Sequence, residues 1–400
     1  MLTTRQLQTF IDVASGNGLK TPFMLTDKAI IRQQCLTFRK LFPRVKLFYA
    51  VKCFSDPDVI KATSPYVDGY DIASVKEVEA LLKVGIDPSR MTFSNPVKSE
   101  DALKKASALK VRRFAFQSNN ELVKIVKHAP GSEVYVRVKM PDSKGAINFS
   151  TKFGCALEEV VPLLLTAKKL GLVPIGLTFH VGSQAIDLTA WPEALKKSHE
   201  IIEKARLNGI DAHVVNIGGG FPVRYTDQDP KIDAVANYVN RNLAPQALGL
   251  TYMAEPGRFI AADSSVIVAS VIGVEDRGDT TWLYLDVGAF HAFFEVFQFK
   301  KFLYPVYSLD HLSRGIAAKK RKKYVLTGPT CDSDDTMAWG VELPEDIAVG
   351  SKLLFASTGA YTVVYGSEFN GFTVPPRRFF DSEDMGIVKR EKKEDVRVVV

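Results

Sequence analysis

At several points in this sequence, a side chain that can take part in catalysis or ligand binding directly follows a short apolar segment. Lys52 follows Leu-Phe-Tyr-Ala-Val, His180 follows a run that ends in Phe, and Glu255 opens the tetrapeptide that ends in Arg258. The triplet Gly218–Gly220 follows a further apolar run. A lysine amine can form a Schiff base when burial activates it, and the N–H groups of a glycine turn can bind phosphate. These residue types therefore suggest a reactive amine next to a phosphate site.

Each of these residues also has a plainer interpretation. A lone lysine after a strand usually marks the exit of the chain to solvent, and a lone glycine triplet is weak evidence for phosphate. His180 could be a core histidine with satisfied hydrogen bonds, and Glu255 with Arg258 could be an ordinary ion pair at a turn. The functional interpretation depends on the fold bringing them together.

Strand-like and helix-like segments alternate between residues 46 and 259. Amphipathic segments predict helices at Val75–Val84, Glu100–Leu109, Leu157–Leu170 and Pro192–Leu207. Eight strand–helix units in about 215 residues predict an α/β fold, a (β/α)8 TIM barrel. The strand candidates, which are short, apolar and rich in β-branched or aromatic residues, are Lys46–Val51, Gly69–Ala73, Met91–Ser94, Arg113–Phe116, Glu133–Lys139, Pro174–Phe179, His213–Ile217 and Leu250–Ala254.

A barrel of this kind carries its reactive groups at the carboxyl ends of its strands. Charges gathered on one rim are costly unless they are paired, so a rim rich in them indicates a site. The residues at or just after the eight expected strand ends are Lys52, Asp71, Asn95, Gln117, Arg137, His180, Gly218–Gly220 and Glu255.

After residue 260, turns replace the long helices, which indicates a mostly β domain. We expect a barrel over residues 23–260 and a β-rich second domain formed by 1–22 and 261–400. Thr26 is expected to cap a helix over Asp27–Phe42, and residues 1–22 are expected to add an edge strand to the β domain. Strand candidates in this domain are Ser265–Val274, Thr281–Val287, Tyr324–Leu326 and Lys352–Ala356.

The composition fits a cytoplasmic globular enzyme. The chain is 46% hydrophobic and 24% charged, and it has neither a membrane-length apolar run nor a signal-peptide segment at its start. Its four widely spaced cysteines fit neither a disulfide framework nor a zinc site, so free thiols and no metal are expected. The net charge is +7, with six positive charges in 314–323. Such a run can contact nucleic acid, but without interleaved aromatics a solvated loop is the better interpretation, and neither nucleic acid nor membrane is an expected partner.

A lysine, a phosphate-binding turn, an arginine and a carboxylate around one barrel mouth predict a pocket for pyridoxal 5'-phosphate (PLP). Lys52 would carry the cofactor, and Gly218, Gly219, Gly220 and Arg258 would hold its phosphate. Glu255 would pair with the pyridine nitrogen, which keeps the ring a strong electron sink. His180 would stack on one face of the ring.

Six motifs, in order, resemble those of the alanine-racemase-fold (fold type III) PLP-dependent decarboxylases. The resemblance is greatest to the ornithine/lysine decarboxylases, with diaminopimelate and arginine decarboxylases as relatives, and it covers about residues 20–380. The motifs are Phe48-Tyr-Ala-Val-Lys52-Cys, Phe179-His180-Val-Gly-Ser183, Ile217-Gly-Gly-Gly-Phe, Glu255-Pro-Gly-Arg258, Gly328-Pro-Thr-Cys331-Asp332-Ser and Gly359-Ala-Tyr361-Thr.

The resemblance implies further roles. Cys331 would deliver a proton to the product carbanion, and Asp332 would contact the distal amine of a small amino-acid substrate. Cys331, Asp332 and Tyr361 would come from the partner subunit of a homodimer with shared active sites, and Lys152 with Asp335 would form an intersubunit salt bridge. Residues implied on the cofactor side are Asp71, Glu77, Arg137, Ser183, Gly257 and Tyr361, and those on the substrate side are Asp332, Glu295, Gln298 and Phe369.

The chain also departs from the family pattern. Phe54 stands where relatives usually have Asn after the Lys-Cys pair, and neither Gln298 nor Phe299 is acidic where the ornithine enzymes grip the far amine. The favoured function is decarboxylation of a basic L-amino acid of the ornithine/lysine type. Alternatives are a decarboxylase for arginine, diaminopimelate or a conjugated diamine, an amino-acid racemase on the same fold, and a catalytically silent relative that binds partners.

Overall fold

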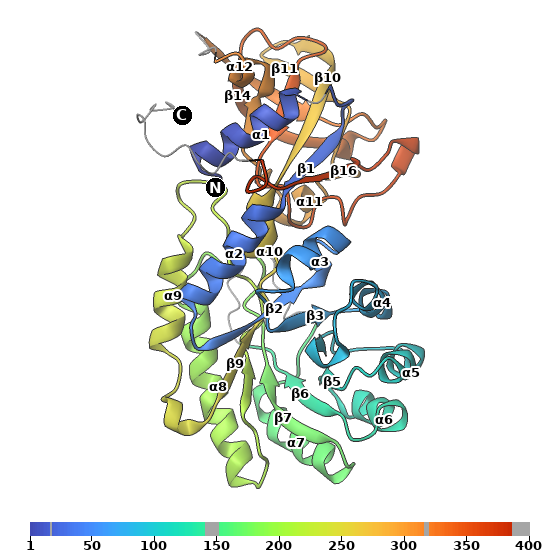
Figure 1. Ribbon diagram of the computed structural model, residues 1–400, viewed down its shortest axis with the longest axis vertical. Helices are drawn as coiled ribbons and strands as arrows, with labels where there is room; N and C mark the ends of the chain where they lie inside the picture. Colours follow the sequence, from blue (N-terminus) through green and yellow to red (C-terminus); the bar gives the residue numbers. More distant parts are fainter. Residues whose placement is uncertain (17, 141–151, 316–319, 386–400) are drawn as a thin grey trace. The chain divides into compact units, whose positions relative to one another are not determined.

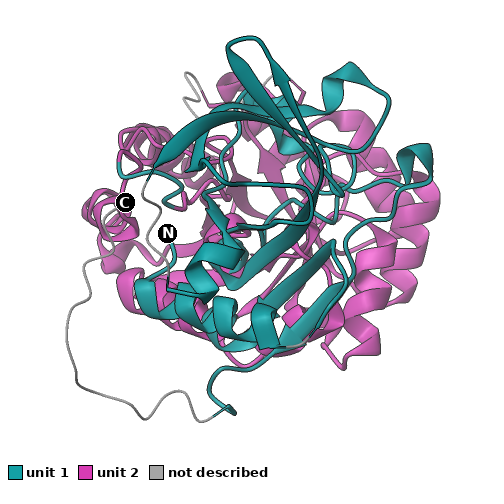
Figure 2. Ribbon diagram, turned by 90° about the horizontal axis from the view of Figure 1, so that it is seen from above, with its two compact units in different colours: residues 1–31, 224–227, 261–400 teal, residues 32–223, 228–260 magenta. Residues whose placement is uncertain are grey.

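The computed structural model describes residues 1–16, 18–140, 152–315 and 320–385 (Figure 1). The chain forms two compact units (Figure 2). Unit 1 comprises Met1–Ile31, Arg224–Asp227 and Ala261–Val400, and unit 2 comprises Arg32–Val223 and Gln228–Ile260.

Unit 2 contains a closed barrel of eight parallel strands, as the sequence predicts. The ring closes where the last of these strands pairs with the first. The strands are β2 (Val45–Ala50), β3 (Gly69–Ile72), β4 (Met91–Phe93), β5 (Arg113–Phe116), β6 (Glu133–Arg137), β7 (Val173–Thr178), β8 (Val214–Asn216) and β9 (Thr251–Ala254).

Helices precede, link and follow the barrel strands in the order expected for this fold. They are α2 (Lys28–Leu41), α3 (Pro57–Thr63), α4 (Val75–Lys83), α5 (Glu100–Ala108), α6 (Asn119–His128), α7 (Val160–Lys169), α8 (Ala190–Leu207), α9 (Ile232–Arg241) and α10 (Arg258–Ala261). Short 3-10 turns are η1 (Val51–Cys53), η2 (Pro88–Arg90), η3 (Leu157–Glu159), η4 (Gln246–Leu248) and η5 (Ala262–Ser264).

Serine side chains fix three of the loops that leave the carboxyl ends of the strands. Ser74, Ser99 and Ser118 cap α4, α5 and α6, and each hydroxyl accepts a hydrogen bond from the backbone N–H three residues on. A cap of this kind stabilises a helix by about 1 kcal/mol. These caps therefore hold the rim of the barrel in place as well as starting the helices.

The barrel interior is a packed core. One layer draws a buried side chain from each of six strands, and Tyr135 is the only member with a polar tip. The layer consists of Phe48, Ala115, Tyr135, Ile175, Val214 and Met253.

Unit 1 is built on a mostly β sheet, again as expected. Its strands follow the order β12-β15-β10-β11-β13-β14, and β1 pairs antiparallel with β10 and parallel with β16. The strands are β1 (Phe23–Asp27), β10 (Ser265–Arg277), β11 (Thr280–Leu285), β12 (Val306–Ser308), β13 (Arg321–Thr327), β14 (Thr336–Pro344), β15 (Lys352–Phe355) and β16 (Arg377–Phe380). Its helices and turns are α1 (Thr4–Gly16), α11 (Glu295–Phe299), α12 (Leu309–Ser313), η6 (Ser333–Asp335) and η7 (Phe369–Gly371).

Two expectations for the start of the chain are wrong. Residues 1–22 do not form an edge strand, because 4–16 form helix α1, whose Phe10 and Ile11 pack into the core against Val266. Thr26 does not cap α2, because its hydroxyl bonds Ser265 Oγ at 2.9 Å. Asp27 takes that place, since its Oδ1 accepts the N–H of Ala29 at 2.9 Å.

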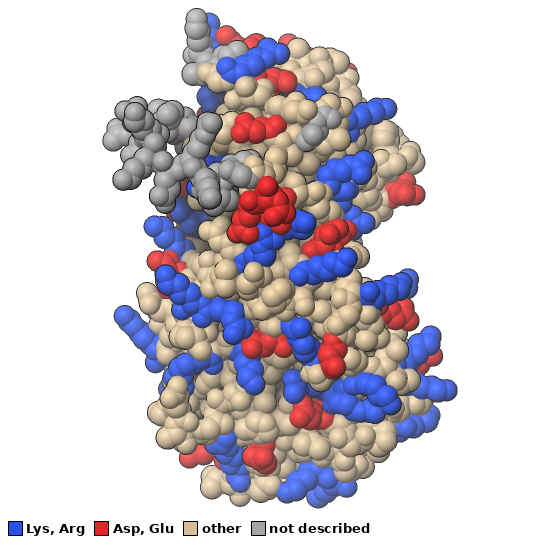
Figure 3. Space-filling view, in the orientation of Figure 1, with Lys and Arg blue, Asp and Glu red and all other residues tan. Residues whose placement is uncertain are grey.

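The basic run has more structure than a loop. Arg321–Lys323 are exposed residues at the start of β13, paired with β14, whereas 316–319 and the tail from 386 lie outside the described residues. On the face drawn in Figure 3, basic side chains are interspersed with acidic ones. No helix in the described part of the chain is long and apolar enough to cross a membrane. Cys35, Cys53 and Cys155 are buried free thiols, and the thiol of Cys331 is free and exposed.

Candidate active site

The lysine at the end of β2 is held by a buried carboxylate. Lys52 lies in η1, and its Nζ forms an ion pair with Oδ2 of Asp71 at the end of β3. The Lys52 side chain is 43% exposed, whereas that of Asp71 is 1% exposed, so the amine is accessible while its partner is not. The other oxygen of Asp71, Oδ1, is buried and has no hydrogen-bond partner among the described residues. Nearby, burial raises the pKa of Glu77, which Lys52 partly offsets.

The turn after β8 has room only for glycine. Gly218 and Gly220 adopt φ angles of +66° and +98°, a region that other residues rarely occupy. A Cβ on Gly218 would lie 2.2 Å from Phe179 O, and one on Gly220 would lie 2.4 Å from Gly182 O. The turn therefore presents bare backbone.

Two further candidates for the phosphate site meet near this barrel end. Nη2 of Arg258 donates a 2.9 Å hydrogen bond to Oγ of Ser183. Both side chains belong to unit 2, where Ser183 follows β7 and Arg258 starts α10. Gly257 stands directly before Arg258.

Glu255 is buried at the end of β9 and receives two side-chain hydrogen bonds on Oε1. Ser94 Oγ donates at 2.7 Å and Asn216 Nδ2 at 2.5 Å. Burial first, and the charge of Asp71 second, raise the pKa of this carboxyl, while Lys52 and the two donors act in the opposite direction. Burial also lowers the pKa of Arg137, whose charge faces both Glu255 and Asp71.

His180 is a neutral base in this setting. Its Nδ1 accepts the N–H of Gly182 at 2.9 Å, so this nitrogen carries no proton. Burial, and then the charges of Arg137 and Lys52, hold the pKa of His180 well below 6.5. Gly219 leaves space beside the ring, because a Cβ there would lie 3.0 Å from His180 Nε2.

The remaining predicted site residues lie in unit 1. The exposed thiol of Cys331 bonds Asn370 Oδ1 at 3.3 Å, and exposed Asp332 caps η6 by accepting the N–H of Asp334. Exposed Gln298 lies on α11 and exposed Phe369 on η7. Tyr361 has a φ of +55°, a strained value for a tyrosine that often occurs at functional sites.

Two of the predicted unit 1 residues have internal contacts instead. Glu295 is 2% exposed and accepts a 3.3 Å hydrogen bond from Tyr304, so its carboxylate is not open to substrate in unit 1. Asp335 is fully buried, and its carboxylate accepts hydrogen bonds from the N–H of Ala289 and from both N–H and hydroxyl of Thr330. The expectation that it bridges to a partner's lysine does not fit this burial.

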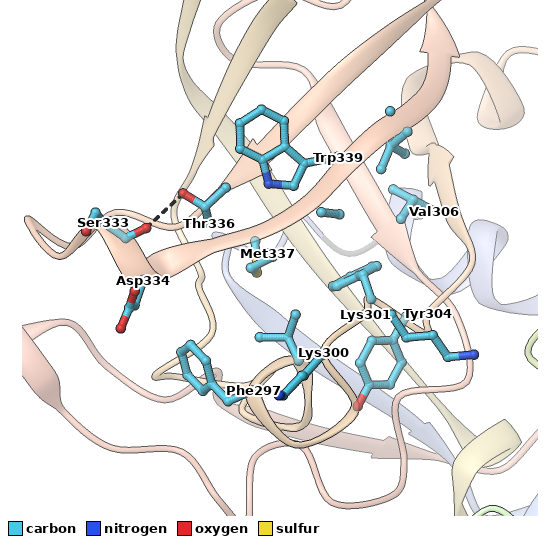
Figure 4. A pocket seen from close by; sticks show the side chains of 15 residues that line it. Phe297, Lys300, Lys301, Tyr304, Val306, Ser333, Asp334, Thr336, Met337 and Trp339 are labelled. Carbon is cyan, nitrogen blue, oxygen red and sulfur yellow. Dashed lines mark hydrogen bonds between the residues drawn. The ribbon is translucent and has the colours of Figure 1, made fainter. Parts of the chain in front are cut away.

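A hollow of about 860 Å³ in unit 1 is lined by sequence neighbours of two of these residues, though not by the residues themselves (Figure 4). Phe297, which lines it, precedes Gln298, and Ser333, which also lines it, follows Asp332. The exposed ring of Trp339 and the side chains of Lys300 and Lys301 also line it.

Three contributors to the barrel site were missed from the sequence: Ser94, Tyr135 and Asn216. Asn216 was within reach of sequence reasoning, because it directly precedes the glycine triplet. Ser94 and Tyr135 carry no such signal, since they belong to ordinary apolar strand segments and meet only in the fold, where their hydroxyl oxygens lie 2.9 Å apart.

The barrel end fits PLP by its donor set. The glycine turn, Arg258 and Ser183 suit a phosphate, the Lys52 amine suits an aldehyde, and the buried Glu255 carboxylate suits a protonated ring nitrogen. The partnerless Oδ1 of Asp71 is a further buried acceptor at this site. These features define a barrel enzyme that uses PLP.

The comparisons place the chain within that class. The model for the pyridoxal-dependent decarboxylase, pyridoxal binding domain, matches residues 28–262. The lysine/ornithine decarboxylase of Selenomonas ruminantium is 32% identical over 384 residues, 95% of this chain and 94% of the relative. The chain belongs to the PLP-dependent decarboxylases of basic amino acids.

Solved structures agree with this assignment. The arginine decarboxylase of Paramecium bursaria Chlorella virus, bound to agmatine, has a TM-score of 0.86 at 29% identity, over 93% of this chain and 100% of that one. The lysine/ornithine decarboxylase of Vibrio vulnificus, complexed with putrescine, has a TM-score of 0.84 at 30% identity, over 95% and 99%. These relatives differ in substrate, so the family is fixed and the amino acid is not.

Proposed function

We propose that the chain decarboxylates a basic L-amino acid, ornithine or lysine first, to the corresponding amine and carbon dioxide. The observation that carries the proposal is the barrel end itself, where the Lys52–Asp71 ion pair, the bare glycine turn and the hydrogen-bonded Glu255 carboxylate occur in one unit.

Bound PLP supplies an electron sink for the electron pair left when the α-carboxylate departs. Lys52 would hold the cofactor through its amine. The Glu255 carboxylate would accept a hydrogen bond from the protonated ring nitrogen. His180, being neutral, would face the ring without adding a charge, and Arg258 with Ser183 and Gly218–Gly220 would hold the phosphate.

The proton that completes the product comes from the Cys331 thiol in this proposal. The exposed Cys331 thiol donates a hydrogen bond to the amide oxygen of Asn370, and a positioned thiol can transfer a proton in such a reaction. Asp332, exposed beside it, supplies the negative charge that a distal ammonium needs. Following the family resemblance, we further propose that a homodimer completes each site, so that Lys52 in unit 2 of one subunit is joined by Cys331, Asp332 and Tyr361 of the partner subunit.

The length of the substrate side chain is the least constrained part of the proposed function. Gln298 is neutral and Glu295 is turned into the interior, so Asp332 is the proposed acidic contact for the far amine. Loss of a second acid at Gln298 weakens the case for short diamine products and leaves arginine, diaminopimelate and a bulkier conjugated diamine as alternatives.

The test is a substrate panel. Purified protein loaded with PLP is incubated with ornithine, lysine, arginine, diaminopimelate, a carboxylated conjugated diamine and leucine, and carbon dioxide and amine are both measured. Release of both from a basic amino acid, with none from leucine, supports the proposal. Inversion at Cα without carbon dioxide release would instead show a racemase.

A further inference from the structure

A chain of hydrogen bonds inside the barrel ends on Glu255. We propose that Tyr135, Ser94 and Asn216 are positioning residues that keep Glu255 ionised and leave its second oxygen, Oε2, for the cofactor's ring nitrogen. This inference rests on the proposed function, because it takes Glu255 as the partner of that nitrogen.

The direction of the chain follows from counting protons. Ser94 has one hydroxyl proton and donates it to Oε1 of Glu255 at 2.7 Å. The 2.9 Å bond between Ser94 and Tyr135 must therefore be donated by the phenol. Tyr135 thus donates to Ser94, and Ser94 donates to Glu255.

The third donor is oriented by the glycine turn. Asn216 Oδ1 accepts the N–H of Gly218 at 2.9 Å, which leaves Nδ2 to donate to Oε1 of Glu255 at 2.5 Å. Both side-chain donors therefore meet the same oxygen. Among the described residues, no hydrogen bond reaches Oε2.

The surroundings make these donors decisive for the charge of Glu255. Burial and Asp71 of β3 favour the neutral acid, while Lys52 beyond β2 and Arg137 of β6 favour the carboxylate. Burial raises the pKa of Tyr135 well above 10, so the phenol stays protonated and remains a donor. Hydrogen bonds to an ionised group are stronger than those between neutral groups, so these donors act together with Lys52 and Arg137 against the effect of burial.

The position of Tyr135 supports a polar purpose for its hydroxyl. The ring belongs to the apolar layer of the barrel and is fully buried, a place that phenylalanine would fill equally well. A buried hydroxyl without a partner is costly, and here the partner is Ser94.

The test uses the full-length, cofactor-free protein, and infrared spectroscopy follows protonation of Glu255 against pH. Glu255→Gln identifies the band. Ser94→Ala should move the titration of Glu255 to higher pH, because a donor to the carboxylate is lost, and Tyr135→Phe should move it in the same direction by less. Tyr135→Phe in the Ser94→Ala background should add nothing, because the phenol acts through Ser94.

A matched control lies two residues before Ser94. Thr92 is buried on β4, and its hydroxyl has no hydrogen-bond partner among the described residues. Thr92→Val should titrate like the wild type. Circular dichroism checks each fold, and Tyr135→Phe, which keeps the ring, carries the test if Ser94→Ala does not fold.

With PLP bound, Ser94→Ala should lower kcat by about tenfold with KM within about twofold, because the electron sink weakens while binding contacts remain. A Glu255 titration unchanged by Ser94→Ala and Tyr135→Phe, or an equal effect of Tyr135→Phe in both backgrounds, overturns the inference. Because the titration needs no cofactor, failure of the protein to bind PLP would instead count against the proposed function.

Discussion

The two units present their candidate residues in opposite ways. In unit 2, Asp71, Glu255 and Arg137 are buried and face one another, so their geometry is fixed before anything binds. In unit 1, Cys331 and Asp332 are exposed; Cys331 bonds Asn370 of η7, and Asp332 bonds Asp334 of its own turn. The difference teaches that the proposed cofactor side is preorganised by burial within unit 2, whereas the proposed substrate side of unit 1 lies exposed at its surface.

The largest expected effect comes from removing the Lys52 amine in unit 2. Lys52→Ala should abolish decarboxylation and the borohydride-fixable cofactor adduct, because the amine proposed to carry the cofactor is removed. Lys46, an exposed lysine on strand β2, which precedes Lys52, provides the control, and Lys46→Ala should stay yellow and active. Absorbance and borohydride labelling measure both, and a labelled, yellow Lys52→Ala protein would remove the basis of the comparison.

The next largest effect concerns substrate choice by the exposed residues of unit 1. Asp332→Ala should lower kcat/KM for basic substrates by about tenfold or more, since a desolvated ammonium loses its partner. Asp334→Ala removes an exposed carboxylate from the same turn and should change little. Gln298→Asp should improve ornithine use. Equal losses in Asp332→Ala and Asp334→Ala would mean that the turn acts through general charge rather than through one contact.

A mixture of two inactive variants tests whether two chains share an active site. Lys52→Ala and Cys331→Ala subunits, mixed equally and allowed to exchange, should form about half heterodimers with one intact site each, which gives about a quarter of wild-type activity. Steady-state rates measure this, and mass spectrometry of the intact dimers confirms exchange. No recovery after confirmed exchange would mean that each chain supplies a complete site.

The smallest expected effect is a pH dependence of stability. Burial, together with Arg137 and Lys52, holds the pKa of His180 well below 6.5. Below about pH 6.5, His180 is therefore protonated in the unfolded chain but stays neutral in the folded chain. Stability should therefore fall as pH drops from about 7 to 5 more steeply in the wild type than in His180→Asn, whose amide keeps the acceptor without titrating. Urea unfolding of the cofactor-free protein measures the difference. Parallel curves would show that His180 is charged in the fold.

Sequence reasoning was sufficient for the barrel because each strand is a separate apolar segment with a turn on either side. It failed at the start of the chain, where residues 1–22 were expected to form an edge strand only because they are too few to fold alone. The helical spacing of Phe10, Ile11 and Ala14 indicates a helix instead. Strands β12, β14 and β16 were missed since they are short or alternate irregularly between buried and exposed residues.

For the site, residue type predicted the groups whose chemistry is distinctive, such as Lys52 and Glu255. It could not predict what surrounds them. Glu295 was chosen for its charge and position, but the fold buries it against Tyr304. Ser94 and Tyr135 were missed because a hydroxyl in an apolar strand becomes informative only when its neighbour across the barrel is known.

The closed ring of unit 2 and the open sheet of unit 1 also differ in how they meet other molecules in a crowded solution. The closed barrel has no edge strand, whereas β14 lies at one end of the strand order of unit 1 and carries the exposed Trp339. An edge strand, paired on one side only, is a template on which further strands can add. We therefore expect aggregation during storage or overexpression to begin at this edge rather than at the barrel.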